Sequence, residues 1–230
     1  MENRIVYIDC ETTGIEEEDR LVQVAYKYRD YDASIVEYFK PQVPISVEAM
    51  SVHHITNEMV ADKKQFMGSE MHSNLKIEFE DVGDIFVAHN AKFDIDMLQK
   101  EGIEVPHSIC TLKVAHDWDK KAELTMHNLQ YLRYYLGLKF DEPINPHDAL
   151  SDVLVLEKLY EFFISEGYTA LEMEAITAKP IILKKMPFGK HRGEFFDKIP
   201  RDYIIWGLKN MDKMDENLEA TFKYWINKGI

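Results

Sequence analysis

The stretch RIVYIDCETTG, residues 4–14, decides the fold. Its first five residues form a short apolar, β-branched run that predicts a buried strand. The run ends at Asp9 and Glu11, two carboxylates placed two residues apart. Side chains at i and i+2 of an extended chain share a face, so both carboxylates project to one side and Cys10 turns away. The following residues, Thr12–Gly14, predict a turn.

Two carboxylates at the mouth of a buried strand repel each other and lose hydration. Both effects raise their pKa unless a cation lies between them. Hard oxygen ligands of this kind suit Mg²⁺ or Mn²⁺. For an isolated D-x-E pair, ordinary strand-end acids are the better interpretation, so the metal hypothesis needs further acids elsewhere in the chain.

A second segment is similar in kind. Ile85–Ala88 is another apolar strand candidate, interrupted by the polar pair His89 and Asn90. Asp94 then lies in the first turn of an expected helix. Asp96 competes for the same role, but on a helix it faces away from Asp94 and into solvent. Three apolar residues carry the helical pattern: Phe93, Met97 and Leu98.

The third segment opens with Asn145 and Pro146, which predict a helix start with Asn as the cap and Pro in the first position. Asp152 interrupts the buried stripe of that helix, where an unpaired acid is costly. In a regular helix His147 would diverge from Asp152 by about 140°. A shared site therefore requires His147 on a loop or a loosened first turn, and a surface histidine at the helix end is the alternative. The stripe consists of Leu150, Val153, Leu154, Leu156, Leu159, Tyr160 and Phe163.

Taken together, D-x-E-T-T-G, H-N-x-x-F-D and H-x-x-x-x-D resemble the three motifs of the DEDD superfamily of 3′–5′ exonucleases, in its histidine-containing, DnaQ-like subclass. The resemblance covers roughly the first 165 residues. Residues 51–56, SVHHIT, are similar to the V-H-G-I-T segment that lies near the terminal nucleotide in this family, with His54 in place of the usual glycine. Cys110–Leu112 and His127–Leu129 stand where the family has a D-T-L and a helix-opening signature.

The resemblance implies an α/β fold, a ribonuclease H-like mixed sheet flanked by helices with a small C-terminal appendage. The chain pattern agrees with it. Leu21–Tyr28 and Ile35–Phe39 are strand candidates separated by the polar turn Arg29–Ser34, as in a meander. Short strands and helical patterns then alternate, as an α/β layer structure requires. The acidic run Glu16–Asp19 is expected to be a solvated loop.

The resemblance also implies the roles of the site residues. Five residues are expected to be catalytic: Asp9, Glu11, Asp94, His147 and Asp152. The four acids would hold two divalent cations, Mg²⁺ or Mn²⁺, and His147 would take the proton from the attacking water. The expected contacts to the nucleic acid are Thr12, Thr13, Gly14, His54, Ile55, His89, Asn90 and Phe93 in the exonuclease domain, with Lys190 and Arg192 beyond it.

Composition is consistent with an intracellular enzyme. The 230 residues, 46% of them hydrophobic, suffice for one sizeable core and an appendage. We expect a cytoplasmic protein with no membrane partner, because the sequence contains no apolar run of about 18 residues and no signal-peptide pattern. Cys10 and Cys110 are too few for a disulfide framework or a cysteine-based zinc site. His53 and His54 are expected to form a loop pair.

The net charge of −14 argues against a nucleic-acid substrate, because affinity for phosphate comes mainly from Lys and Arg. The distribution weakens this objection. From Lys179 onward the chain has eleven basic and seven acidic residues, a charge of +4, whereas residues 1–178 have 16 and 34, a charge of −18. We therefore expect an exonuclease domain over residues 1–178 and a basic C-terminal module over residues 179–230.

The module contains Phe188–Gly193, FGKHRG, which is similar to an F-G-K-x-x-G module appended to some bacterial and phage exonucleases of the exonuclease X-like group. Its two glycines bracket basic residues that would present cations and backbone N–H groups to phosphates. Tyr203 and Trp206 would offer a stacking surface for a base. The alternative is a surface turn over a small aromatic core, and we assign the two aromatics to that core first.

The preferred function is release of nucleoside monophosphates from the 3′ ends of DNA, either by an independent enzyme or by a proofreading subunit. The appended module favours the independent enzyme. An RNA-trimming exonuclease is the second candidate, because nothing in the motifs reads the 2′-hydroxyl. The third is a catalytically inactive nucleic-acid-binding module, which is disfavoured because all five chemical positions carry competent residues.

Overall fold

A computed structural model describes residues 4–141, 143–211 and 214–229. The chain divides into two compact units. The first comprises Met1–Leu112 with Met126–Glu174, and the second comprises Lys113–Thr125 with Ala175–Ile230. The second unit thus consists of the C-terminal residues and an internal segment, Lys113–Thr125. The domain boundary expected between residues 178 and 179 stays a prediction.

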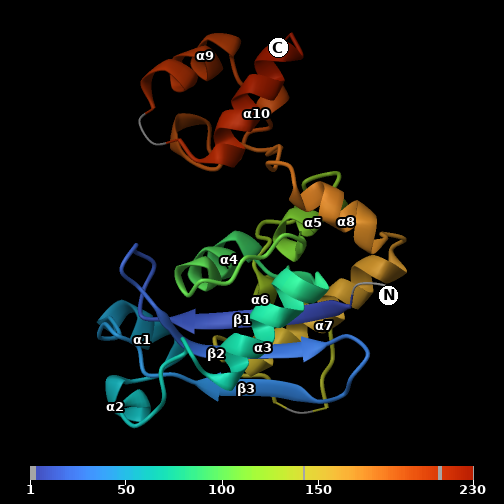
Figure 1. The fold of residues 1–230 in the computed structure, drawn as a ribbon. Coiled ribbons are helices and arrows are strands. Elements are labelled where there is room, and N and C mark those ends of the chain that lie inside the picture. Colours follow the sequence, from blue (N-terminus) through green and yellow to red (C-terminus); the bar gives the residue numbers. More distant parts are fainter. Residues whose placement is uncertain (1–3, 142, 212–213, 230) are drawn as a thin grey trace. The chain divides into compact units, whose positions relative to one another are not determined.

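The first unit is built on a five-stranded mixed sheet in the order β3-β2-β1-β4-β5. β1 pairs antiparallel with β2 and parallel with β4, while β2–β3 is antiparallel and β4–β5 is parallel. Figure 1 shows β1, β2 and β3 side by side in blue. This is the mixed sheet flanked by helices that the sequence predicts. The strands are β1 Ile5–Thr12, β2 Leu21–Tyr28, β3 Ser34–Tyr38, β4 Ile85–Ala88 and β5 Ser108–Cys110.

Helices of the first unit follow the predicted alternation with strands. They are α1 Val47–His53, α2 Asn57–Val60, α3 Glu70–Lys76, α4 Ala91–Lys100, α6 Leu129–Tyr135 and α7 Ala149–Ser165, together with the π-helix η1 Ile77–Val82. The division between the units falls within two further helices, α5 Thr111–Trp118 and α8 Ala170–Thr177. No helix in the part of the chain that the structure describes is long and apolar enough to cross a membrane.

Strand β1 is longer than predicted. The sequence analysis ends the strand at Ile8, but β2 continues to pair with β1 as far as Thr12, and Asp9 and Glu11 lie opposite Ala25 and Gln23. The prediction of the strand end was wrong because cross-strand pairing, rather than side-chain hydrophobicity, sets it. The register shifts between Glu11 and Thr12, and the loop after the strand is closed by a 2.9 Å hydrogen bond from the Thr13 N–H to the Arg20 carbonyl.

The two faces of β1 have different partners, as the two-residue period requires. Val6, Ile8 and Cys10 belong to the hydrophobic core that also includes residues of α3, η1 and α4. Tyr7 lies on the opposite face, where its ring contacts the Tyr160 ring of α7 edge to face. Asp9 and Glu11 share the face of Tyr7, so both carboxylates are directed toward α7.

Helix α7 begins at Ala149, not at the predicted Pro146. Its N-cap is Asp148, whose side chain accepts a 3.2 Å hydrogen bond from the Ser151 N–H. Gln23 of β2 fixes this end of the helix, because its amide donates to Asp148 Oδ1 at 2.9 Å and accepts from the Ala149 N–H at 3.1 Å. The local Asn-Pro signal was overridden by this tertiary contact, and the residues before Asp148 form a loop.

The second unit has its own small core, formed by Met186, Phe196, Ile199, Ile204, Leu218 and Phe222. Its C-terminal helices are α9 Arg201–Asn210 and α10 Glu216–Asn227, preceded by the short 3₁₀ turns η2 Gly189–His191 and η3 Phe196–Lys198. The two helices approach closely at Gly207, where an added Cβ would clash with the ring of Phe222. Trp206 is 50% exposed, so the assignment of this residue to the core was wrong.

Candidate active site

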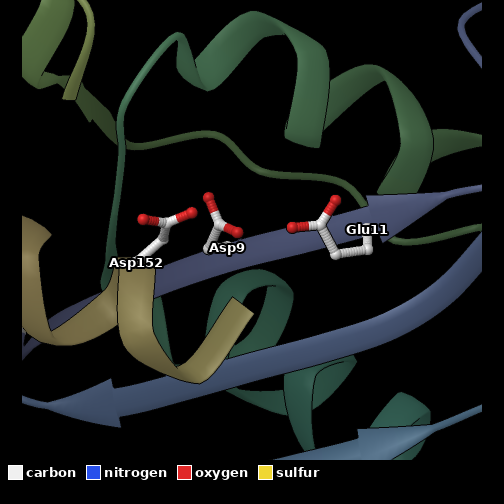
Figure 2. A group of neighbouring side chains, drawn as sticks. All are labelled: Asp9, Glu11 and Asp152. Carbon is white, nitrogen blue, oxygen red and sulfur yellow. The ribbon is translucent and has the colours of Figure 1, made fainter. Parts of the chain in front are cut away.

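Three carboxylates from two elements meet at one place on the sheet. Asp9 and Glu11 extend from β1, and Asp152 extends from the first turn of α7. One oxygen atom from each residue lies within 4.8 Å of the other two. Figure 2 shows the three carboxylates gathered beside β1, with Asp9 between the other two. The structure therefore brings together three of the four acids predicted to bind metal.

Asp152 is buried and held by two hydrogen bonds. Gln130 of α6 donates from Nε2 to Oδ1 at 2.6 Å, and the backbone N–H of His147 donates to Oδ2 at 3.0 Å. Both bonds stabilise the carboxylate form, although burial outweighs them and the pKa of Asp152 is raised. The sequence pattern identified Asp152 but gave no sign of Gln130, whose position depends on the packing of α6 against α7.

The fourth acid, Asp94, is not part of the group of three and instead contacts the backbone of β1. It is 3% exposed in the first turn of α4, as predicted, and its Oδ1 accepts a 3.1 Å hydrogen bond from the backbone N–H of Cys10. This N–H is available because β4 pairs with β1 only as far as Tyr7. Asp94 thus replaces a missing strand partner and places its negative charge close to Asp9. Asp96 pairs with Lys92 on the exposed face, as expected.

His147 lies in the loop before α7, in the left-handed region with φ 61°. This is the arrangement that a shared site requires, because a helical His147 would point away from Asp152. Its side chain is exposed and its backbone N–H contacts Asp152. The general-base role of the imidazole stays a prediction.

The electrostatics of the cluster are those of crowded, desolvated acids. The pKa of Asp9 is raised well above its ordinary value by burial and by the charges of Asp94, Asp152 and Glu11. Burial, followed by Asp152 and Asp94, raises the pKa of Glu11 to about 8. Burial also raises the pKa of Asp94 to about 7, against the opposing hydrogen bonds from Cys10. Without a cation, these acids would hold their protons to a higher pH than ordinary carboxylic acids do.

This donor set fits a divalent metal ion. The three converging groups are carboxylate oxygens, which hard cations such as Mg²⁺ and Mn²⁺ prefer. A bound cation would also remove the cause of the raised pKa values, because it favours the charged form of each acid. The three acids therefore form a candidate site for a divalent cation, of the kind that the two strand-end acids first indicated.

The residues just after the acids form a tightly bonded loop. Thr12 is 6% exposed and donates its hydroxyl to the Gly14 carbonyl at 2.7 Å. Thr13 is fully buried, and its hydroxyl donates to Asp19 Oδ1 at 2.5 Å while accepting from the Arg20 N–H at 3.0 Å. Gly14 lies so close to the Asp19 carboxylate that a Cβ would clash with it. Contacts of Thr12, Thr13 and Gly14 with a nucleotide stay predictions.

The departure at His54 has a structural explanation. His54 is the C-cap of α1 with φ 61°, a conformation that glycine adopts most easily, which accounts for the glycine usual in related sequences. The next residue, Ile55, is only 3% exposed and packs with Val22, Ile45 and Val60. The predicted substrate contacts of His54 and Ile55 are untested.

His53 is a residue whose importance sequence reasoning missed. It was assigned with His54 to a loop pair, but it is the buried last residue of α1. Its Nδ1 accepts from the Ile55 N–H at 3.0 Å, so Nε2 carries the proton that is donated to the Thr12 carbonyl at 3.1 Å. Burial lowers the pKa of His53, consistent with this neutral tautomer. His53 therefore links α1 to the end of β1.

The segment between β4 and α4 holds three further predicted contacts. His89 is partly buried and hydrogen-bonds through its two ring nitrogens to the Thr111 hydroxyl and the His127 carbonyl, both at 2.9 Å. Asn90 caps α4 in the left-handed region with φ 68°. Phe93 is partly buried against the main core. Their contact with substrate stays a prediction.

In the second unit, Lys190 and Arg192 are exposed on and beside η2. Two backbone N–H groups of this loop are already used within it. The Arg192 N–H donates to the Gly189 carbonyl at 3.2 Å and the Gly193 N–H to the Met186 carbonyl at 2.8 Å. A phosphate contact here would therefore depend on the two side chains more than on these amides.

Comparison with known proteins places this site in a family. The exonuclease family RNase_T matches residues 6–160. Exodeoxyribonuclease 10 of Escherichia coli (strain K12) is 31% identical over 238 residues, covering 95% of this chain and 97% of that protein. DNA polymerase III subunit epsilon of Treponema pallidum (strain Nichols) is 32% identical over 187 residues, covering 76% of this chain and 85% of that protein.

Solved structures agree with the fold. The structure of exonuclease X in complex with 5′ overhanging duplex DNA has a TM-score of 0.57 and 28% identity, and the match covers 75% of this chain and 99% of that chain. The zinc-bound E. coli ExoI–ssDNA complex has a TM-score of 0.63 at 15% identity, covering 75% of this chain and 42% of that chain. At this lower identity the likeness concerns the fold alone.

A second family, described as a putative quorum-sensing-regulated virulence factor, matches residues 176–212. The matched segment includes the F-G-K-x-x-G stretch, but the description does not assign that stretch a role. The larger part of the chain is identified by the RNase_T match over residues 6–160. The grouping of Asp9, Glu11 and Asp152 agrees with an exonuclease site. The chain belongs to the RNase_T exonuclease family and is a 3′–5′ exonuclease of the DnaQ-like, DEDD type.

Proposed function

We propose that this protein is a metal-dependent 3′–5′ exodeoxyribonuclease that releases nucleoside monophosphates from the 3′ ends of DNA. The observation that carries the proposal is the convergence of Asp9, Glu11 and Asp152 in a chain 31% identical to a protein named exodeoxyribonuclease 10. That similarity extends over 95% of the chain and so includes most of the second unit. It favours an independent enzyme over a proofreading subunit, and a cytoplasmic location stays part of the proposal.

We assign two divalent cations, Mg²⁺ or Mn²⁺, to the acidic cluster. Asp9, Glu11 and Asp152 would hold one of them, and Asp9 with Asp94 would serve the other. When bound, such cations stabilise the attacking and leaving oxygens of an in-line phosphodiester displacement. The buried position of Asp94 on the backbone of Cys10 supports a contribution through its charge at Asp9.

His147 would remove the proton from the attacking water. Its loop position leaves the His147 side chain exposed, and its backbone N–H contacts Asp152. An imidazole titrates near neutral pH and is therefore suited to this task. Thr12 and the Thr12–Gly14 backbone would hold the terminal nucleotide, and Phe93 would pack against its sugar or base.

The decisive experiment measures release of 3′-labelled mononucleotides from matched single-stranded DNA and RNA, with Mg²⁺ or Mn²⁺ and with EDTA. The natural chain is compared with Asp9→Ala. We expect metal-dependent release from DNA that disappears in Asp9→Ala. Preferential release from RNA would replace the substrate in this proposal, and no release from either polymer would refute the enzymatic proposal.

The second unit is proposed to hold the strand through Lys190 and Arg192. Both side chains are exposed, and the unit belongs to the basic part of the chain. Neutralising both residues should weaken binding and reduce its salt dependence, because each phosphate contact on a single strand contributes about 0.7 to the slope. Unchanged affinity and salt dependence would refute this role.

A further inference from the structure

The second unit contains a cavity of about 420 Å³, and none of the five residues expected to be catalytic lines it. Every residue that lines it belongs to Lys113–Thr125 or Ala175–Ile230, so the cavity lies within this one unit. Its walls come from α5, from the segment between α8 and η2, and from α10. The volume falls in the range of about 300–1,000 Å³ that is usual for small-ligand sites.

One side of the cavity is apolar and aromatic. Tyr224 and Trp225 of α10 line it together with Ile181 and Leu183. The indole Nε1–H of Trp225 is buried, and it has no hydrogen-bond partner among the described residues. The ammonium group of Lys228 lies 5.4 Å from the Tyr224 ring centroid and 5.0 Å from that of Trp225. A flat ring that entered the cavity would therefore contact these aromatic side chains at their edges or displace the exposed side chain of Lys228.

The other side of the cavity is cationic. Four lysines line it against a single lining carboxylate, that of Asp117. Two of them are bonded to neutral carbonyl groups: Lys113 donates to Thr177 and Lys179, both at 2.8 Å, and Lys184 donates to His116 at 3.0 Å and to Asp119. Such bonds orient an ammonium group without neutralising its charge. The four lysines are Lys113, Lys120, Lys179 and Lys184.

The remaining two lysines are the ones available to a ligand. Lys120 pairs at 2.6 Å with Asp117 in an exposed ion pair, which is weak in water. Lys179 has no ion-pair partner within the described ranges. Burial lowers the pKa of Lys184 while the nearby charge of Asp119 opposes that effect, as expected for a cation held at a partly desolvated wall. The cavity therefore combines positive charge with aromatic surface.

We propose that this cavity binds a nucleoside phosphate, with the base against Tyr224 and Trp225 and the phosphate between Lys120 and Lys179. A divalent cation does not fit, because the lining is predominantly cationic. An acidic peptide would satisfy the lysines but would leave the aromatic wall without a flat partner. The inference rests on the proposed function only in taking nucleic acid as the source of the nucleotide, which is either a unit of a strand or the free monophosphate.

The test uses the full-length chain with Asp9→Ala, which prevents cleavage of the probe. Intrinsic tryptophan fluorescence is followed during titration with (dT)₁₂, with dTMP, and with an acidic peptide of matched charge. We expect quenching by a thymidine ligand that is lost in Trp225→Phe. Quenching by (dT)₁₂ alone assigns the cavity to a strand, and equal affinity for dTMP assigns it to the free monophosphate. Quenching by the peptide alone, or by none of the three, would overturn the proposal.

Charge variants locate the phosphate. Lys120→Glu with Lys179→Glu should weaken thymidine-ligand binding by about tenfold or more and flatten its salt dependence. Lys198→Glu with Lys209→Glu, at two exposed lysines outside the cavity, is the matched control and should change binding less than twofold. Equal effects of the two charge reversals would show a general field rather than a site, and would contradict the proposal.

Two further comparisons keep the result interpretable. Lys120→Gln with Lys179→Gln should show a smaller loss in the same direction, and unchanged melting temperatures would exclude unfolding as the cause. Because binding is measured without cleavage, failure of nucleotide release in the natural chain would refute the exonuclease proposal and leave this one standing. Loss of binding in the cavity variants would support this proposal, and it would neither support nor refute the Asp9-dependent release of nucleotides.

Discussion

The side-chain amide of Gln130 donates a hydrogen bond to Asp152 Oδ1 at 2.6 Å, across the packed helices α6 and α7. Its carbonyl oxygen in turn accepts a 3.1 Å hydrogen bond from Arg133. The orientation of the amide is thereby fixed, with its N–H group directed at the carboxylate. Gln130 therefore orients Asp152, one of the three acids of the candidate metal site.

Replacing Gln130 with Leu should weaken metal binding by about 10- to 100-fold, because the Asp152 carboxylate loses the partner that orients it. The measurement is nucleotide release as a function of Mn²⁺ concentration. The half-saturating concentration should rise, while the rate at saturating metal changes less. Gln99→Leu, at an exposed glutamine of α4, is the matched control. An unchanged metal dependence in Gln130→Leu would refute the positioning role.

The face of the sheet that carries Asp9 and Glu11 holds α7 through three sets of polar contacts. Gln23 bonds to Asp148 and to the Ala149 backbone, Lys27 bonds to Glu157, and Glu161 accepts from both Tyr7 and Arg29. The contacts are spaced along the helix, so they fix its position on β1 and β2. Asp152 lies between the first two contacts, and its approach to Asp9 and Glu11 follows from this docking.

Replacing Gln23 with Leu should lower the free energy of unfolding by about 1–3 kcal/mol, because the Ala149 N–H and the Asp148 carboxylate each lose a partner at a buried position. Urea denaturation followed by circular dichroism provides the measurement. We also expect weaker metal binding, measured as a higher half-saturating Mn²⁺ concentration for nucleotide release, because the first turn of α7 carries Asp152. Gln42→Leu, outside the sheet, serves as the control. Equal stability of the natural and Gln23→Leu chains would contradict the docking argument.

How far the sequence predicts this molecule depends on the range of the interactions. The alternation in β1 is local, and it correctly placed Asp9 and Glu11 on one face with Cys10 on the other. The start of α7 is not local. Asn145 and Pro146 form a valid helix-start signal, but the contact of Asp148 with Gln23, 125 positions earlier in the chain, decides where the helix begins.

The acids of the site were found because they recur in recognisable motifs. Their supports were not, because Gln130 and His53 act through contacts that no motif records. One signal was nevertheless present: Gln23 interrupts the apolar run Leu21–Tyr28, and a polar residue buried in a strand requires a partner. The position of Asp94 on the Cys10 backbone could not be predicted, since it depends on β4 ending early.

A pH dependence of stability follows from His89. Burial lowers its pKa from the ordinary 6.5 to about 4. Between these values the unfolded chain binds a proton at this position and the folded chain does not, so the contribution of His89 to stability is lost as the pH falls from 6.5 toward 4. The two ring contacts are compatible with either charge state, because the Thr111 hydroxyl can donate to Nδ1 or to the Ala88 carbonyl. Burial is what favours the neutral ring.

Between pH 6.5 and pH 5 this loss should amount to about 1.5 kcal/mol, at about 1.36 kcal/mol per pKa unit. Urea unfolding of the natural chain and of His89→Gln at several pH values isolates it, because other titrating groups are common to both. The stability difference between the two proteins should shrink as the pH is lowered. A difference that is constant from pH 7 to pH 5 would show that His89 has the same pKa in the folded and unfolded chains.

Close helix packing in the second unit gives a stability prediction. Gly207→Ala introduces a Cβ that clashes with the Phe222 ring, and overpacking of this kind costs about 1–3 kcal/mol. The better helix propensity of Ala offsets up to about 1 kcal/mol of this cost. We therefore expect a lower melting temperature for the second unit. In a Phe222→Leu background the added cost of Gly207→Ala should fall, and additive effects in this double-mutant cycle would argue against the contact.

The role of His147 is distinguishable from that of the acids, because it is exposed and only its backbone contacts Asp152. His147→Ala keeps this backbone bond, so metal binding and DNA binding should change less than about twofold, whereas loss of a general base lowers turnover by about 10²- to 10⁴-fold. Single-turnover release of labelled mononucleotide at saturating metal measures the chemical step. His107→Ala, a second exposed histidine, should retain full activity. Unimpaired turnover in His147→Ala would mean that another group accepts the proton of the attacking water. Loss of both turnover and metal binding would mean that the loop serves to hold Asp152.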